Sequence, residues 1–140
     1  MPTSTATAAW EGGLRAGRGH FNAASGAFGG DYSFRTRFEG AKGTNPEELI
    51  AAAHAGCFSM ALSAELGKAN IKPESISTEA TLTMEKLEAG FTITKVHLDV
   101  SAKIPNADKA AFDKAAADAK AGCPVSRVLK AEITMNAKLI

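Results

Sequence analysis

The two cysteines, Cys57 and Cys123, are the side chains most capable of taking part in a chemical reaction. So few cysteines suit a reducing compartment, where a thiol pair is more often catalytic or redox-sensing than structural. A cysteine thiolate can attack a peroxide oxygen and become a sulfenic acid, which a second thiol converts into a disulfide. The residue types therefore allow Cys57 and Cys123 to act as a peroxidatic and resolving pair.

Two other interpretations of the cysteines remain open on residue type alone. Free cysteine is among the most buried residue types, so both thiols could be inert core side chains. His54 lies three positions before Cys57 on the same helix face, a spacing that would suit a Cys–His nucleophile pair. No oxyanion-hole or orienting residue accompanies that pair in the sequence. The same His54 could also be a polar group packed inside the fold.

Cys57 lies within a predicted long helix that begins at Pro46. Asn45 is a favourable N-cap, Pro46 suits the first helical position, and Glu48 has the spacing of a capping box. One predicted stripe carries Leu49, Ala53, Cys57, Met60 and Ala64, and a second carries Ile50, His54, Ala61 and Glu65. Because residues 49–62 are almost all apolar, we expect this helix to be buried nearly all round. Burial raises the pKa of a thiol, so a reactive Cys57 needs a cation close by.

Cys123 lies where one predicted helix ends and another begins. A helix over residues 107–121 would be capped by Asn106 and ended by Gly122, with Phe112, Ala116 and Ala119 facing inward. Pro124 then suits the first position of a short second helix. A helix N-terminus favours the thiolate form, which makes Cys123 the more easily ionised of the two thiols.

The remaining sequence predicts strands, and with the helices an α+β fold in a single domain over residues 1–140. Glycines divide the first forty residues into short runs, and residues 32–38 alternate so that Arg35 and Arg37 would project from one face of a strand. Strands are also expected over residues 76–85, 91–104 and 133–139. The apolar phase changes near Thr94 and Lys95, which predicts a β-bulge there.

Composition excludes several classes of function. Sixteen Lys and Arg residues against 15 Asp and Glu give a net charge of +1, which lacks the basic surface of a nucleic-acid-binding protein. The longest apolar run, residues 49–62, is shorter than the roughly 20 residues of a membrane span. The cysteines and the three histidines show no zinc-ligand spacing, so no metal or other cofactor is expected. The first residues lack a secretory signal pattern, so we expect a soluble cytoplasmic protein without nucleic-acid or membrane partners.

Three runs of sequence resemble the OsmC/Ohr family, and more closely its OsmC branch (osmotically inducible protein C). They are TRFEG at 36–40, GTNPEELIAAAHAGCFSM at 43–60 and AGCPVS at 121–126. The resemblance implies an OsmC-like fold, with antiparallel sheets packed around a long buried central helix. It also implies an intertwined homodimer with shared active sites at the subunit interface. The implied activity is a cysteine-dependent peroxidase that reduces organic hydroperoxides, and hydrogen peroxide less efficiently, and that a lipoyl-type dithiol re-reduces.

The resemblance also assigns roles to individual residues. Cys57 would be the peroxidatic cysteine and Cys123 the resolving one. Arg37 would lower the pKa of the Cys57 thiol and hold the peroxide, while Glu47 would orient Arg37. In the Ohr branch the arginine comes from an earlier glycine-rich loop, so Arg18 is the alternative to Arg37.

The position of Glu47 suggests how two subunits would share a site. Glu47 and Cys57 are ten positions apart, which is about 15 Å along a continuous helix. A local pair of Arg37 and Glu47 would therefore lie far from Cys57 of the same chain. We expect Arg37 and Glu47 to reach Cys57 of the partner subunit.

One function of another class also fits the cysteines. In a redox sensor without peroxidase turnover, a Cys57–Cys123 disulfide would form slowly and change the binding of a partner. Among peroxide substrates, the apolar residues expected around Cys57, which are Leu49, Phe58 and Met60, favour a bulky organic hydroperoxide over hydrogen peroxide.

Overall fold

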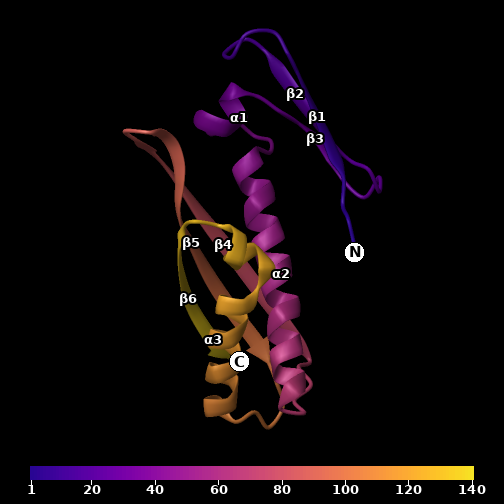
Figure 1. Ribbon diagram of the computed structural model, residues 1–140, viewed down its shortest axis with the longest axis vertical. Coiled ribbons are helices and arrows are strands. Elements are labelled where there is room, and N and C mark those ends of the chain that lie inside the picture. The colour runs from indigo at the N-terminus through magenta and orange to yellow at the C-terminus, as the bar shows by residue number, and fades with distance from the viewer. The chain divides into compact units, whose positions relative to one another are not determined.

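The computed structural model describes residues 1–140 and consists of two compact units, Met1–Leu49 and Ile50–Ile140. Each unit contains one three-stranded sheet, β1-β2-β3 in the first and β4-β5-β6 in the second (Figure 1). Helix α2 (Pro46–Lys68) begins in the first unit and continues into the second. That residues 1–140 form one domain stays a prediction.

The first unit is built on an antiparallel sheet of short strands. These are β1 (Ala6–Glu11), β2 (Arg18–Ala23) and β3 (Gly29–Tyr32), in that spatial order. On this sheet the ring of Tyr32 stacks on Phe21, with 4.0 Å between the ring centroids. A Cβ at Gly19 would collide with the rings of Tyr32 and Trp10, so a glycine is required at this position. The short strands predicted between the glycines are thereby confirmed.

The predicted strand over residues 32–38 is wrong, because Phe34–Phe38 forms the short helix α1. Ser33 caps it: the Ser33 hydroxyl accepts from the Thr36 amide at 3.2 Å, and the Thr36 hydroxyl accepts from the Ser33 amide at 2.9 Å. The rings of Phe34 and Phe38, four positions apart, lie 5.0 Å apart. Residues four apart share a face in a strand and in a helix alike, so the alternation did not distinguish them. The capping box decides for the helix.

Helix α2 begins as predicted. The Asn45 side chain accepts the Glu48 amide at 2.8 Å, while the Glu48 carboxylate accepts the Thr44 hydroxyl at 2.7 Å instead of completing the box. The loop before the helix passes through Gly40 and Gly43, whose φ angles are +68° and +146°. These are conformations that glycine adopts readily. The helix then runs without interruption to Lys68.

The burial of α2 differs from the prediction. Its buried residues repeat every four positions and are His54, Phe58, Leu62 and Leu66. In the predicted buried stripe, Ala53, Met60 and Ala64 are exposed, while Cys57 is half-buried. A helix that is apolar on nearly every side has no strong periodicity, so its sequence does not indicate which face packs inward. The expectation of burial nearly all round is wrong for the single chain.

By length and composition, α2 would also be long enough to cross a membrane, with a mean hydropathy of 1.4 over its most apolar window. That property alone is a weak indication, because the core helices of soluble proteins share it.

The second unit contains a mixed sheet. Strands β4 (Ser75–Leu87) and β5 (Gly90–Lys103) are antiparallel, whereas β6 (Glu132–Leu139) runs parallel to β5. The prediction of antiparallel sheets is therefore wrong for this pair. The chain passes through α3 (Lys109–Gly122) and α4 (Pro124–Val128) between β5 and β6, which supplies the crossover that parallel strands need.

The bulge predicted near Thr94 and Lys95 is confirmed. Thr83 pairs with Lys95, but the next residue of β4, Met84, pairs with Ile93. Thr94 is the extra residue, and it restores the inward phase of the apolar side chains along β5.

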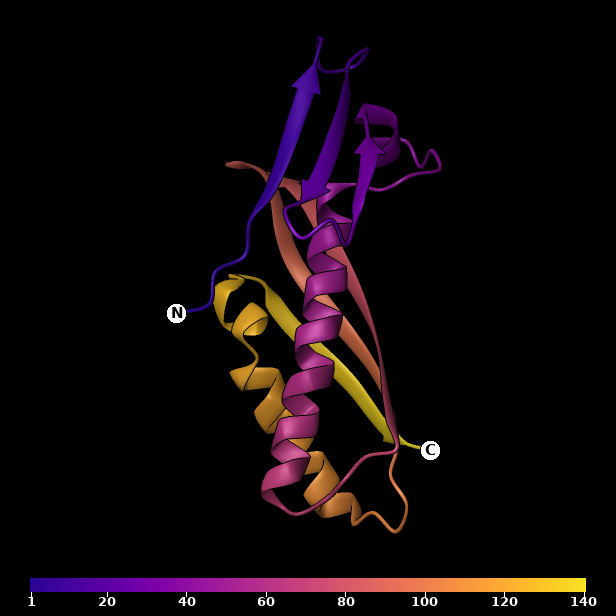
Figure 2. The ribbon, with the colours of Figure 1, turned by 90° about the vertical axis from the view of Figure 1, so that its right-hand side faces the viewer.

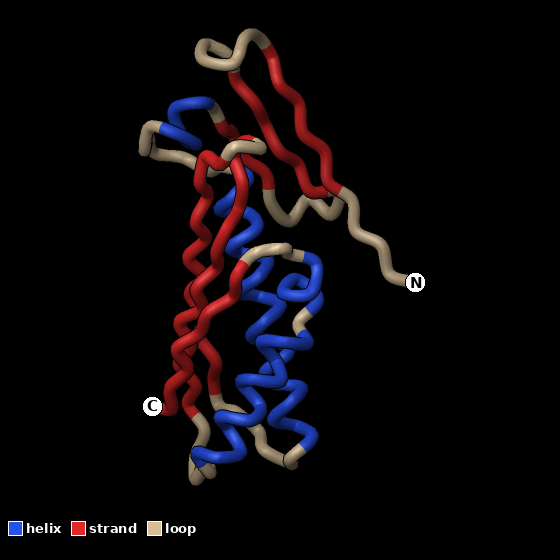
Figure 3. The backbone as a smooth tube through the Cα atoms, turned by 60° about the vertical axis from the view of Figure 1, so that its left-hand side comes forward, coloured by secondary structure: helices blue, strands red, loops and turns tan.

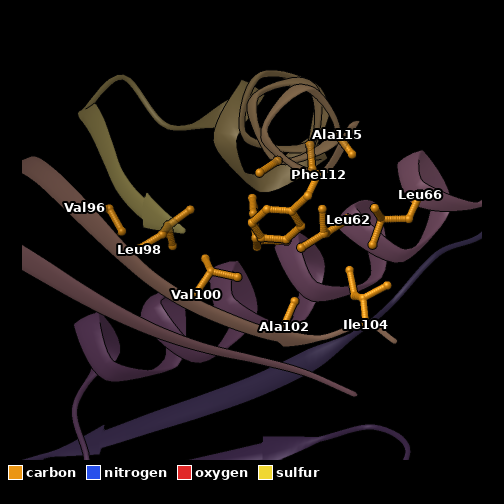
Figure 4. Close-up of a cluster of buried hydrophobic side chains, with 12 residues drawn as sticks. Leu62, Leu66, Val96, Leu98, Val100, Ala102, Ile104, Phe112 and Ala115 are labelled. Carbon is orange, nitrogen blue, oxygen red and sulfur yellow. The ribbon is translucent and has the colours of Figure 1, made fainter. Parts of the chain in front are cut away.

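Helices and sheet form two layers in the second unit. Residues 50–68 of α2 lie beside α3 on one face of the sheet (Figures 2 and 3). Side chains of α2, α3 and β5 fill the space between the layers (Figure 4). Phe112, Ala116 and Ala119 face inward as predicted. Asp108 caps α3 in place of Asn106, which instead adopts a left-handed conformation with φ of 57°.

Candidate active site

The structure brings the two cysteines together in the second unit. Cys57 lies on α2 and Cys123 joins α3 to α4, yet their Sγ atoms are 2.8 Å apart. Both thiols are free; Cys123 is fully buried and Cys57 is half-buried. A disulfide bond is about 2.05 Å long, so the two sulfurs need to approach by less than about 1 Å to join.

Two helices fix the backbone of Cys123. Its amide donates to the Ala119 carbonyl of α3 at 2.9 Å, and its carbonyl accepts the Arg127 amide of α4 at 3.0 Å. Pro124 occupies the first position of α4, as predicted. Cys123 therefore caps both helices and presents its sulfur to α2 from a fixed position.

The surroundings of the two thiols favour different protonation states. Burial raises the pKa of the Cys57 thiol, as does its hydrogen bond with Cys123, although the Val125 amide lowers it. Burial acts in the same direction on Cys123. There, hydrogen bonds from Cys57, from the amides of Ser126 and Val125 and from the Ser126 hydroxyl outweigh it and lower the pKa. No basic side chain is among the groups that shift the pKa of Cys57. Within this unit the thiolate is therefore favoured on Cys123.

His54 is fully buried, and its partner is not the cysteine of its own helix. Its Nε2 lies 2.8 Å from the Ser126 hydroxyl of α4, and its Nδ1 is buried without a hydrogen-bond partner. Burial lowers the pKa of His54, which keeps the ring neutral. The hydrogen-bond partner of Cys57 is Cys123, so the Cys–His nucleophile pair is not formed. Sequence reasoning missed Ser126, which lies three residues after Cys123 in α4.

In the first unit, Arg37 and Glu47 form the ion pair expected from their sequence positions. Arg37 Nε donates to both Glu47 carboxylate oxygens, at 2.7 and 3.2 Å. The Glu47 side chain is only 13% exposed and that of Arg37 is 37% exposed, so water screens this pair less than most surface pairs. The pair joins the last turn of α1 to the first turn of α2. Its catalytic role stays a prediction.

The alternative arginine has a different setting. Arg18 pairs with Glu11 at 3.1 Å, and the two side chains are 82% and 70% exposed. An ion pair so exposed contributes little to stability, because water screens its charges and the long side chains stay mobile. The shielded setting of Arg37 suits a fixed positive charge better than that of Arg18.

A mostly aromatic pocket of about 250 Å³ adjoins Arg37 in the first unit. Its lining residues are Trp10, Leu14, Tyr32, Ser33, Phe34, Arg37 and Phe38. Sequence reasoning missed it because its walls come from β1, the loop after β1, the end of β3 and α1. The pocket offers an apolar surface beside one guanidinium group.

No group of three or more His, Cys, Asp or Glu side chains is arranged to bind a metal ion.

Comparison with known proteins places these features in a family. The family model of OsmC-like proteins matches residues 39–138, which include both cysteines. The chain is also 53% identical over 131 residues to Peroxiredoxin OsmC of Escherichia coli (strain K12), covering 93% of this chain and 92% of that protein. The chain belongs to the OsmC-like family. At this similarity over nearly its whole length, it is a cysteine-based peroxidase.

More distant relatives of this OsmC-like protein belong to the other branch. The Organic hydroperoxide resistance protein of Xanthomonas axonopodis pv. citri (strain 306) is 30% identical over 101 residues, covering 71% of this chain and 69% of that protein. The higher identity to the OsmC relative confirms the OsmC branch.

Solved structures support the fold. OhrB of Bacillus subtilis superposes with a TM-score of 0.71 at 25% identity, over 96% of this chain and 98% of that one. An organic hydroperoxide resistance protein from Elizabethkingia anophelis gives 0.79 at 25% identity, over 100% and 98%. The α+β OsmC-like fold, with two small sheets and a long central helix, is thereby confirmed.

Proposed function

We propose that this OsmC-like peroxidase reduces organic hydroperoxides, and hydrogen peroxide less efficiently, through Cys57 and Cys123. The observation that carries the proposal is the pair of free thiols with sulfurs 2.8 Å apart. The Cys57 thiolate attacks a peroxide oxygen, the O–O bond breaks, and the leaving alkoxide takes a proton to become an alcohol. Cys123 then attacks the Cys57 sulfenic acid, giving a disulfide and water. A lipoyl-type dithiol, itself oxidised to its disulfide, returns both thiols in the cytoplasm.

Activation of Cys57 needs a positive charge, which we assign to Arg37. The groups around Cys57 leave its pKa raised, and no basic side chain is among them. Arg37 is held by Glu47 at 2.7 Å, and both would act on the thiol together. Glu47 and Cys57 lie ten positions apart on one unbroken helix, about 15 Å along its axis. Each active site would therefore combine Cys57 and Cys123 of one chain with Arg37 and Glu47 of its partner.

The exposed face of α2 supports an intertwined homodimer as the arrangement that shares these sites. Its residues are mostly small or apolar and are Ala52, Ala53, Gly56, Met60, Ser63, Ala64 and Gly67. Among these residues, the large apolar side chain of Met60 is 79% exposed in the single chain. Small residues let two helices approach closely, and a second copy of the chain offers the same complementary face. The occupant of this face would be α2 of the partner.

The aromatic pocket beside Arg37 predicts the order of substrates. We expect kcat/KM for cumene hydroperoxide to exceed that for hydrogen peroxide by about tenfold or more, since burying an apolar substituent is worth about 1.5–3 kcal/mol. Steady-state assays with one dithiol reductant measure both values. Leu14→Gln, on the pocket wall, should lower the value for cumene hydroperoxide and leave that for hydrogen peroxide unchanged. Equal or greater efficiency of the unaltered protein with hydrogen peroxide would contradict the assignment.

Mass spectrometry after one equivalent of cumene hydroperoxide tests the proposed chemistry directly. We expect a loss of about 2 Da with no added oxygen, the signature of an internal disulfide. Repeated turnover with excess dithiol then separates a peroxidase from a redox sensor, which would form the disulfide slowly and turn over little. An unchanged mass would contradict both functions and indicate inert thiols.

A further inference from the structure

We propose that Arg15 makes the aromatic pocket beside Arg37 selective for hydroperoxides that carry a carboxylate next to an apolar segment. This inference rests on the proposed function, because it names the class of substrate that the pocket of that enzyme prefers. The apolar segment would pack against the aromatic walls, and the guanidinium group of Arg15 would bind the carboxylate. Arg15 is in this sense a specificity-determining residue and takes no part in the chemistry.

Arg15 lies at the rim of the pocket, on the loop that joins β1 to β2. Its guanidinium carbon is 4.6 Å from the centroid of the Phe34 ring, and Phe34 is one wall of the pocket. Its neighbour in the chain, Leu14, is another wall residue. A guanidinium group that stacks on an aromatic face keeps the N–H donors at its edge available for a ligand. Arg15 therefore places a positive charge next to the apolar lining.

Hydrogen bonds fix the loop that carries Arg15. The indole Nε1 of Trp10 donates to the Gly12 carbonyl at 3.1 Å, and the Gly17 amide donates to the Gly13 carbonyl at 2.8 Å. A Cβ at Gly17 would collide with that Gly13 carbonyl oxygen, so the turn requires glycine there. Because Trp10 also lines the pocket, the same side chain joins the pocket wall to the loop.

The charge of Arg15 is not compensated within the chain. Arg37 already donates to both carboxylate oxygens of Glu47, so its charge has a fixed partner. Arg15 is exposed and forms no ion pair or side-chain hydrogen bond. None of the residues that line the pocket carries a carboxylate. A carboxylate on the ligand would match the planar fork of the Arg15 guanidinium group and supply the missing counter-charge.

The size of the pocket fits the apolar part of such a ligand. Its volume of about 250 Å³ is below the range of drug-binding sites, which suits a single benzene ring with a short alkyl group. Burial of that part is worth the same for a neutral and for an anionic ligand of equal shape. A difference in affinity between two such ligands therefore measures the contribution of the charged group at the rim.

Two probes of equal shape test the proposal without any peroxide, namely 4-isopropylbenzoate and 4-isopropylbenzamide. Trp10 is the only tryptophan of the chain and lines the pocket, so its fluorescence reports binding of either probe to the full-length protein. We expect the benzoate to bind about three- to fivefold more tightly than the amide, the size expected of one partly exposed ion pair. Added salt should reduce this preference.

Substitutions at Arg15 assign the preference to its side chain, and because that side chain is exposed they should not disturb folding. Arg15→Gln should bring the two affinities together, Arg15→Lys should keep part of the preference, and Arg15→Glu should invert it. Arg35→Gln is the matched control, since it removes one positive charge from a residue that is 74% exposed and pairs with Glu39. That variant should keep the preference. A preference that survives Arg15→Gln, equal affinities in the unaltered protein, or no binding of either probe would overturn the proposal.

Turnover of a carboxylated substrate provides a second measurement. 4-Carboxycumene hydroperoxide differs from cumene hydroperoxide only by its carboxylate. In Arg15→Gln, the ratio of kcat/KM for the carboxylated to the neutral substrate should fall about three- to fivefold, through KM and not through kcat. An unchanged ratio would contradict the role of Arg15. If the unaltered protein turned over neither substrate, the proposed function would be wrong, and the binding of the two probes would still decide the role of Arg15.

Discussion

Replacement of Cys57 with serine is expected to lower hydroperoxide consumption by at least about a thousandfold, because serine cannot supply a thiolate to attack the O–O bond. Cys57 is the thiol that reaches the surface, being half-buried, whereas Cys123 is fully buried. The measurement is the loss of cumene hydroperoxide in the presence of a dithiol.

The matched control is Cys123→Ser. It should still consume about one equivalent of hydroperoxide per Cys57, since the first oxidation needs only that thiol. Its mass should rise by about 16 Da, the mass of one oxygen, instead of falling by about 2 Da. If Cys123→Ser lost the first oxidation and Cys57→Ser kept it, the roles of the two cysteines would be exchanged. That outcome would fit the lower pKa of Cys123 in the single chain.

Mixed dimers of a Cys57→Ser chain and an Arg37→Ala chain are expected to recover activity that neither variant has alone. With sites shared across the interface, one site of each mixed dimer has an intact Cys57 and the intact Arg37 of the partner. Unfolding and refolding the two chains together in equal amounts makes half of the dimers mixed. Activity should then return to about a quarter of that of the unaltered protein.

Sites confined to one chain predict the opposite result, because every site would lack one of the two groups and the mixture would stay inactive. Arg35→Ala is the matched control on the same short helix. Arg35 is 74% exposed and pairs with Glu39 at 3.7 Å, so its loss should leave activity unchanged. Full activity of Arg37→Ala alone would refute the assignment of the cation and direct attention to Arg18.

Local interactions let the sequence determine much of this fold. The side chain of Asn45 caps α2 where its position predicted. The extra residue, Thr94, is visible as a phase change because strand side chains alternate strictly between two faces. Pro124 begins α4 for a similarly local reason, its fixed φ. The OsmC-like motifs carried the identity of the family, since they surround both cysteines.

Tertiary structure alone decided the features that depend on distant contacts. A period of two and a spacing of four agree over the few residues between Tyr32 and Phe38, so only the capping hydrogen bonds of Ser33 distinguish α1 from a strand. The parallel pairing of β6 with β5 likewise depends on where the crossover through α3 and α4 returns the chain.

The inner face of α2 shows the same division most clearly. Its sequence is apolar on nearly every side, so periodicity could not indicate that His54 faces inward and Met60 outward. Packing against the core side chains of α3 and β5, far away in the sequence, selected that face. The sequence alone identified the two thiols and the histidine as candidate reactive groups. The tertiary structure brought the Ser126 hydroxyl to His54 and Cys123 to Cys57, because hydrogen bonds between distant segments form only where the core brings them together.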